Sequence, residues 1–220
     1  MYILAFDTTA SACSIILQED NNVLSRFHQT MEFGQSEVLI PAISEMLSHN
    51  NLNFTDLGLL LVCVGPGSFT GVRSSISAAR TFPLACPKLA LGGVSAFDAY
   101  VLGLDENERA DVNAVIIETK REDFYIQLFD KDLKKLTPPQ ALAYEDIMPL
   151  LRGKKVSLIG DGVERFLSRP SGLFFHSIQM PESLDINLLA KAGIKQYQDK
   201  RLDYPKPLYL RAPDVSTPKK

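Results

Sequence analysis

Short apolar runs alternate with longer amphipathic stretches along the first half of the chain. The short runs have the length and the composition of strands, and they occupy residues 2–6, 13–18, 23–28, 59–64 and 89–91. The longer stretches place apolar residues three or four positions apart, which is typical of helices. These stretches occupy residues 36–50, 71–82 and 95–102. We expect Pro83 to end the second helix, because proline removes a donor from the helical hydrogen-bond ladder.

The second half of the chain repeats this order after a polar, charged stretch at residues 105–111. The predicted strands are 113–118, 124–129, 156–159 and 173–176, and helices are predicted within 141–151 and 184–198. Each half opens with a strand that ends in an acid, Asp7 in the first and Glu118 in the second. We therefore expect an α/β protein with a lobe of residues 1–104, a smaller lobe of residues 105–183 and a cleft between them. Residues 184–220 are expected to pack back on the first lobe.

A glycine-rich loop, Gly65-Pro66-Gly67-Ser68-Phe69-Thr70-Gly71, lies between a predicted strand and a predicted helix. This layout directs backbone N–H groups toward one point, which is often occupied by an anion. The loop lacks the lysine of a Walker phosphate loop, and its third glycine is one residue late for a dinucleotide-binding loop. Two interpretations remain, an anion-binding loop and a tight turn between strand and helix. An anion-binding loop has no evident use for Phe69.

Composition sets limits on what the chain binds. Its 220 residues are 45% apolar and 22% charged, which is ordinary for a globular protein, and the net charge of −3 does not by itself attract nucleic acid. Cys13, Cys63 and Cys86 are far apart and form no CxxC pair, so we expect buried, reduced thiols in a cytoplasmic protein. The first residues lack the pattern of a signal peptide, no apolar run is long enough to span a membrane, and the basic end at 217–220 reads as a solvated tail.

Seven segments together resemble one protein family. They are residues 3–9, 12–14, 36–41, 65–73, 93–95, 117–120 and 207–211, and they follow in the family's order over residues 2 to 211. The family is TsaB, also called YeaZ. The resemblance implies an actin-like fold of the ASKHA, sugar-kinase type, made of two ribonuclease-H-like lobes of which the second is small.

The resemblance also implies a function. Members of the TsaB family take part in making threonylcarbamoyladenosine at position 37 of tRNAs that read ANN codons, in the cytoplasm. They pair with the catalytic subunit TsaD, an ATPase called TsaE joins the pair, and tRNA is met only through the complex. The implied role is a non-catalytic scaffold that carries no cofactor, with ATP and metal on the partner subunits.

Two positions support the absence of catalysis in this chain. TsaD carries two histidines four residues apart on one helix face, as metal binding requires. The matching positions here are Ala96 and Tyr100, and His28, His49 and His176 are scattered. We therefore predict no metal site, which also speaks against a metallopeptidase.

The strand-end acids have two interpretations. Asp7 either holds Mg²⁺ through water, as in actin-like ATPases, or accepts hydrogen bonds from nearby backbone N–H groups. For Glu118 we favour the backbone role. Thr8 and Thr9 meet a phosphate or cap the hairpin. The alternative function is thus an ATPase or kinase that binds nucleotide in the cleft, and the candidate residues are Asp7, Thr8, Thr9, Gly65, Gly67, Ser68, Thr70, Gly71 and Glu118.

The expected contact with a TsaD-like partner lies on two helices. Its residues are Ser36, Glu37, Val38, Ile40, Pro41, Ser44 and Leu47 on the first helix, and Val72, Arg73, Ser75, Ile76 and Ala79 on the second. The competing interpretation is that these stripes face the lobe's own core, and each helix is expected to do both with different faces. An isolated chain is expected to form a homodimer through the same surface.

One cation on the second helix needs a special explanation. Arg73 starts that helix, where the macrodipole disfavours positive charge, so we expect a carboxylate partner such as Asp7, Glu37 or an acid of another subunit. The sequence also departs from the family at Ser74-Ser75 and at residues 80–83. These departures are expected to shorten or kink the helix.

Overall fold

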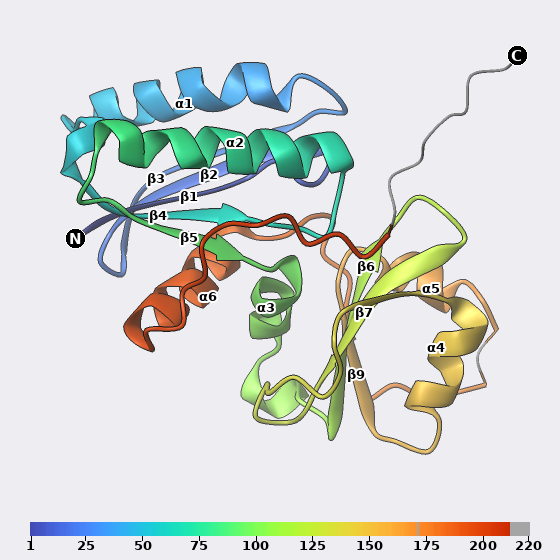
Figure 1. Cartoon of the computed structure of the whole chain (residues 1–220). Coiled ribbons are helices and arrows are strands. Elements are labelled where there is room, and N and C mark those ends of the chain that lie inside the picture. The colour runs from blue at the N-terminus through green and yellow to red at the C-terminus, as the bar shows by residue number, and fades with distance from the viewer. Residues whose placement is uncertain (171, 212–220) are drawn as a thin grey trace, which may run out of the picture.

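The structure, a computed structural model, describes residues 1–170 and 172–211, and it contains two five-stranded sheets (Figure 1). The first sheet has the strand order β3-β2-β1-β4-β5. Its strands are β1 (Tyr2–Asp7), β2 (Ala12–Glu19), β3 (Asn22–Thr30), β4 (Leu57–Cys63) and β5 (Ala90–Val94). The central β1 pairs with β2 in antiparallel and with β4 in parallel orientation.

The second sheet repeats this arrangement with the order β10-β9-β6-β7-β8. Its strands are β6 (Val112–Glu118), β7 (Asp123–Phe129), β8 (Gln140–Ala143), β9 (Val156–Ile159) and β10 (Ser177–Gln179). The central β6 pairs antiparallel with β7 and parallel with β9. The duplicated order that the sequence predicts is therefore confirmed, although the strand predicted at 173–176 lies at Ser177–Gln179.

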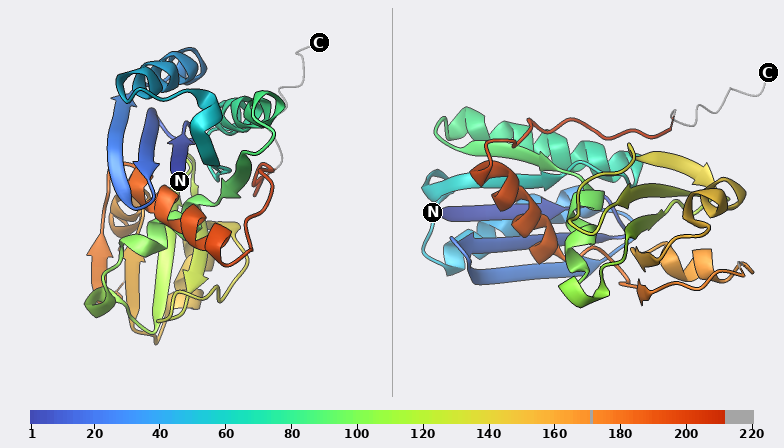
Figure 2. Two further views of the ribbon diagram at one scale, coloured as in Figure 1. Left: turned by 90° about the vertical axis from the view of Figure 1, so that its left-hand side faces the viewer. Right: turned by 90° about the horizontal axis from the view of Figure 1, so that it is seen from below.

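Helices and sheets alternate in layers. Helices α1 (Gln35–His49) and α2 (Phe69–Ala85) cover one face of the first sheet, and α4 (Tyr144–Leu151) and α5 (Val163–Leu167) cover the outer face of the second. Helices α3 (Ala96–Tyr100) and α6 (Ile186–Gln198) pack in the apolar core between the two sheets. Figure 2 shows this layering from two further sides. Short 3-10 turns cover Phe54–Asp56, Val101–Gly103 and Glu106–Glu108.

The β1 sequence explains why this strand is the centre of the first lobe. Leu4 and Phe6 point into the core under α1 and α2, whereas Ile3 and Ala5 point into the core shared with α6. A strand that is apolar at every position fits only where both faces of a sheet are covered. Helix α6 supplies the second cover by packing across β1, β2, β4 and β5, as expected for the residues from 184 onward. The tail at 217–220 lies outside the described residues.

Helix α2 differs from its prediction. It contains Pro83 and continues to Ala85, so the expectation that Pro83 ends the helix is wrong. A proline in the last turn removes only one hydrogen bond, and the N–H of Cys86 still donates to the carbonyl of Phe82. The sequence analysis also missed α5, which is only five residues long.

Residues 201–211 form an extended segment, called here the C-terminal strap, that runs from the first lobe to the second (Figure 1, red). At its start, the N–H of Gly93 donates to the carbonyl of Asp203 over 2.9 Å. At its end, Arg211 forms an ion pair with Asp123 at the start of β7. The strap therefore connects the edge strand β5 to the second sheet.

The middle of the strap completes a small apolar core. The N–H of Leu208 donates to the carbonyl of Val64 over 2.9 Å, and its side chain packs on Val64, Val72 and Ile76. A Cβ atom on Gly93 would lie 2.8 Å from the Cα of Pro205, so only glycine lets the strap lie this close. Gly93 therefore contacts the start of the strap, and Leu208 in the family-like segment 207–211 contacts the end of β4 and the inner side of α2.

Candidate functional site

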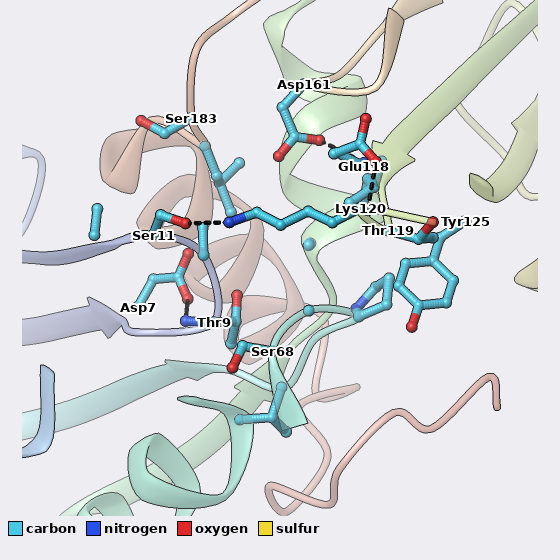
Figure 3. Close-up of a pocket in the computed structure, with 18 of the residues that line it drawn as sticks. Asp7, Thr9, Ser11, Ser68, Glu118, Thr119, Lys120, Tyr125, Asp161 and Ser183 are labelled. Carbon is cyan, nitrogen blue, oxygen red and sulfur yellow. Dashed lines mark hydrogen bonds between the residues drawn. The ribbon is translucent and has the colours of Figure 1, made fainter. Parts of the chain in front are cut away.

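A cleft of about 850 Å³ lies between the lobes, and the carboxyl ends of β1 and β6 reach its walls (Figure 3). Asp7, Thr9 and Ser11 line it from the first lobe, and Glu118 and Lys120 from the second. The ammonium group of Lys120 crosses the cleft and donates to the hydroxyl of Ser11 over 3.0 Å. The two turns that follow the central strands therefore contact each other directly.

Asp7 is held by the backbone of its own turn. The N–H of Thr9 donates to its Oδ1 over 2.7 Å, so the predicted backbone hydrogen bond is confirmed. The carboxyl group is only 6% exposed, and no cation in the described parts of the chain pairs with it. Burial therefore raises the pKa of Asp7, although the hydrogen bond from Thr9 opposes this shift.

Glu118 is held in a similar way but has a cation as well. It accepts a hydrogen bond from the N–H of Lys120, which confirms the predicted backbone role. Its other oxygen accepts from the Nε of Arg165 on α5 over 2.6 Å. The sequence analysis missed Arg165, because the short α5 was not predicted.

A third acid, Asp161, follows β9 and was also missed. Its Oδ1 accepts from the N–H of Glu118 over 2.9 Å, and both Asp161 and the buried Tyr100 line the cleft. Burial raises the pKa of Asp161 from 3.8 to about 6. Parallel strands β6 and β9 end at the same sheet edge, so the acid in Gly160-Asp161-Gly162 was a signal that could have been used.

The glycine loop packs as a tight turn. The N–H of Ser68 donates to the carbonyl of Thr9 over 2.7 Å, and the Ser68 hydroxyl accepts from the N–H of Gly71. A Cβ atom at Gly67 would collide with the carbonyl of Thr9, and one at Gly71 with the carbonyl of Thr8. The geometry therefore supports the tight-turn interpretation, in which two glycines let α2 pack against the turn after β1.

Three further residues proposed for a nucleotide site, Thr8, Gly65 and Thr70, lie in different surroundings. The hydroxyl of Thr8 donates to the carbonyl of Gly71 over 2.9 Å and lies 3.1 Å from the Oγ of Ser75. This side chain thus joins α2 to the turn instead of capping the hairpin. Gly65 is buried at a φ of +97°, and Thr70 is exposed at the start of α2.

The three cysteines are buried and unpaired, as predicted. Burial raises the pKa of Cys13 to about 11 and that of Cys63 well above its ordinary value, and the nearby Asp7 adds to both shifts. The Sγ of Cys63 lies 3.5 Å from the hydroxyl of Thr9. Both thiols are therefore protonated near neutral pH. In residues 1–170 and 172–211, no three His, Cys, Asp or Glu side chains are grouped as metal ligands.

The predicted partner face is only partly on the surface. Five of its α1 residues are exposed and Val38 is half-buried; the exposed ones are Ser36, Glu37, Ile40, Pro41 and Ser44. The prediction is wrong for five other side chains, which lie in the chain's own core: Leu47, Val72, Ser75, Ile76 and Ala79. On α2 this follows because one side of the helix rests on the sheet and the strap. Its exposed residues include Phe69, Arg73, Ser77, Arg80, Thr81 and Leu84.

Arg73 has an aromatic partner set instead of the expected carboxylate. Its Nε donates to the hydroxyl of Tyr209 over 2.8 Å, and its guanidinium lies 3.6 Å from the ring centre of Phe69. In the parts of the chain that the structure describes, Arg73 forms no ion pair. The expectation of a partner in Asp7 or Glu37 is therefore wrong, and Phe69 has a use as the platform for Arg73.

Comparison with known proteins identifies a family. Residues 33–173 match the sequence model of TsaD, described as tRNA N6-adenosine threonylcarbamoyltransferase. The chain is 27% identical to the tRNA threonylcarbamoyladenosine biosynthesis protein TsaB of Buchnera aphidicola, over 94% of this chain and 97% of that protein. It is 26% identical to the TsaB protein of Escherichia coli, over 96% and 95% of the two chains.

Solved structures show the same fold. YeaZ from Pseudomonas aeruginosa superposes with a TM-score of 0.80 at 17% identity, over 95% of this chain and 99% of that one. A putative N-acetylmannosamine kinase from Listeria monocytogenes superposes with a TM-score of 0.56 at 10% identity, over 91% and 100%. A protein with actin-like ATPase fold from Bacteroides thetaiotaomicron gives 0.50 at 10%, over 87% and 95%. The predicted actin-like, sugar-kinase-type fold is therefore confirmed. No helix in residues 1–170 and 172–211 has both the length and the apolar character needed to cross a membrane.

Proposed function

Because this chain belongs to the family of the TsaD model and is a TsaB-type member of it, we propose that it serves tRNA threonylcarbamoyladenosine biosynthesis as a non-catalytic subunit. In this proposal it binds a TsaD-type catalytic subunit, a TsaE-type ATPase joins them, and tRNA is contacted only through the complex. ATP and metal belong to the partners. A cytoplasmic location is supported by the three buried cysteines, which form no disulfide.

The observation that carries this proposal is the state of the cleft acids. Asp7 is tied to Thr9, Glu118 to Arg165, and Asp161 to the N–H of Glu118. A carboxylate that holds a metal or activates a nucleophile needs a free oxygen facing its target. Glu118 uses both of its oxygens within the chain, on the N–H of Lys120 and on Arg165, and Asp7 and Asp161 each use Oδ1 to hold a turn. These structural contacts support a scaffold more than an enzyme.

A surface suited to a partner lies on the helical side of the first lobe. Ile40 and Pro41 are exposed on α1, Phe33 is 85% exposed just before it, and Leu84 is 84% exposed on α2. Large apolar side chains exposed on one side are typical of protein contact surfaces. In the isolated chain this surface is proposed to pair with a second copy.

The main test is reconstitution of tRNA modification with purified subunits. We expect no modification by this chain alone, and modification when the TsaD-type and TsaE-type subunits are added with the activated threonylcarbamoyl donor. The readout is labelled threonine transferred to tRNA. Transfer by the chain alone, or full transfer by the other two subunits without it, would overturn the proposal.

The contact surface is tested with a matched pair of variants. Ile40 on α1 is 40% exposed, and Ile178 on β10 is 42% exposed. We expect Ile40→Arg to weaken binding of the TsaD-type subunit at least 10-fold and Ile178→Arg to leave it unchanged. The molecular mass in solution of the isolated wild-type chain and of both variants shows whether Ile40→Arg also breaks a homodimer. Equal affinity of both variants would place the contact elsewhere.

A second candidate function rests on the volume of the cleft. About 850 Å³ lined by both lobes, with Lys120 across it, is within the range of small-molecule sites. An ATPase or kinase would bind Mg·ATP there. A rise in melting temperature with millimolar Mg·ATP, lost in Lys120→Ala, would favour this candidate over the scaffold. No shift would count against it.

A further inference from the structure

Arg73 lies between two aromatic rings at the first turns of α2. Phe69 precedes it by four residues, so both side chains lie on the same side of the helix. Tyr209 approaches from the C-terminal strap, and its ring centre is 5.4 Å from that of Phe69 and 5.8 Å from the Arg73 guanidinium. We call these three side chains the arginine cluster.

The arginine cluster fixes the direction of the guanidinium but leaves its end unused. The Nε group donates to Tyr209, and the face of the guanidinium stacks on Phe69. No acceptor in the described parts of the chain contacts the two terminal amino groups. Phe69 is 40% and Tyr209 45% exposed, and Arg73 is exposed beside them. The unused amino groups therefore belong to an oriented, accessible cation.

A second arginine on the same helix shows the contrast. Arg80 lies seven residues later, stacks on Tyr204 of the strap at 5.1 Å, and donates from a terminal amino group to the carbonyl of Pro205. Both arginines thus attach the strap to α2. Only Arg73 makes this attachment through Nε and keeps both terminal amino groups for another acceptor.

The position of Arg73 makes such an acceptor favourable. The positive end of the helix dipole lies at the start of α2, so an unneutralised cation is unfavourable there. A carboxylate fits the pair of parallel N–H donors at the end of a guanidinium and would neutralise the charge. An arginine flanked by exposed aromatic rings has the composition of the residues that dominate binding energy in protein interfaces.

We propose that the arginine cluster is a preformed receptor for an Asp or Glu side chain of the partner protein. This inference rests on the proposed function, and it names the chemistry of one contact within it. A protein carboxylate is favoured over an RNA phosphate because the chain carries a net charge of −3. Binding to a side chain already held in place costs little conformational entropy, so one such contact contributes strongly to affinity.

The test measures the dissociation constant between the full chain and the TsaD-type subunit. We expect Arg73→Ala to weaken binding about 10-fold or more, and Arg73→Lys to restore only part of it, because lysine keeps the charge but loses the two-donor geometry. Tyr209→Phe removes the orienting hydrogen bond and is expected to weaken binding 2- to 3-fold. Raising the salt from 50 to 300 mM should weaken wild-type binding more than that of Arg73→Ala.

Arg80→Ala is the matched control. It releases the strap from α2 as Arg73→Ala does, but it does not remove a pair of free terminal amino groups, because one amino group of Arg80 already donates to Pro205. We expect less than a 2-fold change in affinity. A loss as large as that of Arg73→Ala would mean that strap attachment, not a carboxylate contact, explains the effect, and the inference would be wrong. Melting temperatures of all variants show which of them are folded.

Two further outcomes separate the alternatives. Arg73→Glu should abolish binding, and replacing one acid of the partner by arginine should restore it; a scan of the partner's acids without rescue would overturn the inference. If Arg73→Ala weakens binding of tRNA to the chain or complex and leaves partner affinity unchanged, the ligand is a phosphate, and the inference is wrong. If the wild-type chain binds no TsaD-type subunit, the proposed function fails and the inference fails with it.

Discussion

At the carboxyl end of its central strand each lobe places an acid, yet the two acids are held differently. Asp7 and Glu118 both accept a hydrogen bond from the N–H two residues later. Glu118 has Arg165 as a cation and lies partly open to the cleft, whereas Asp7 is buried and pairs with no cation among the residues that the structure describes. The same local turn therefore holds a stable ion pair in one lobe and a carboxyl group with a raised pKa in the other.

The two lobes also differ in the length of the helices that cover their sheets. Helices α1 and α2 have 15 and 17 residues, and their counterparts α4 and α5 have 8 and 5. The longer pair carries the exposed residues of the proposed partner face. The comparison teaches that one arrangement of strands and helices is built with long helices in the first lobe, where the partner face is proposed, and with short helices in the second.

The largest expected effect tests the glycine contacts of the two lobes. A Cβ at Gly71 would collide with the carbonyl of Thr8, whereas one at Gly162 would lie 2.9 Å from the backbone of Ile117. We expect Gly71→Ala to lower the free energy of unfolding by about 3 kcal/mol and Gly162→Ala by about 1–2 kcal/mol. Urea unfolding measures both.

Gly58→Ala is the control for this pair. Its added methyl group would meet the flexible side chain of Met1, which can move aside, so less than about 1 kcal/mol is expected. If Gly71→Ala proves as mild as Gly58→Ala, the turn after β1 is not packed on α2 as described.

The next effect concerns the ion pair between Glu118 and Arg165 in the second lobe. Glu118→Ala leaves Arg165 without its carboxylate, and we expect a loss of about 1–2 kcal/mol, reduced by solvent because both side chains are partly exposed. Arg165→Ala and the double variant complete a double-mutant cycle. A coupling free energy near zero would show that the ion pair with Arg165 adds nothing to the stability that Glu118 provides.

The smallest effect is a pH dependence that comes from the buried acids. The pKa of Asp161 rises from 3.8 to about 6 on folding, so between these values the folded chain binds more protons than the unfolded chain. The free energy of unfolding therefore falls as pH rises through this window, by about 1–2 kcal/mol after allowance for solvent. Asp161→Asn should flatten this slope in unfolding curves measured between pH 4 and 7.

Asp7→Asn gives the matching result in the first lobe. Asparagine keeps an oxygen for the N–H of Thr9 but carries no charge to bury, so we expect higher stability than wild type at pH 7. Lower stability at pH 7 would show that the Asp7 carboxylate is stabilised by something other than the contacts seen here.

Much of the fold followed from the sequence because its signals are local. The strand that ends at Asp7 and the strand that ends at Glu118 are continuous apolar runs, and the order of elements around them repeats. The predicted helix end at Pro83 was wrong, because a proline in the last turn of a helix costs little and the helix continues to Ala85. The short α5 gave no periodic signal, so Arg165 on it could not be assigned to Glu118.

The candidate site was harder to predict because it depends on contacts between distant segments. The tight-turn interpretation of the glycine loop could be preferred only once the structure showed the carbonyl of Thr8 next to Gly71. In the same way, the burial of Val72 and Ile76 could be recognised only once the strap was seen to place Leu208 on them. Periodicity marks an apolar stripe but does not say whether it meets the chain's own core or a partner. For the same reason, Arg73 was expected to meet a carboxylate when Tyr209 lay 136 positions away in the sequence.

The C-terminal strap also sets a mechanical limit. It is anchored to β5 at Asp203 and to the second sheet at Arg211, and the eight Cα–Cα steps from one anchor to the other can reach about 28 Å at most. It therefore works as a tether of fixed length on one flank of the molecule. Any widening of the inter-lobe space must pivot around that flank or first release Arg211 from Asp123.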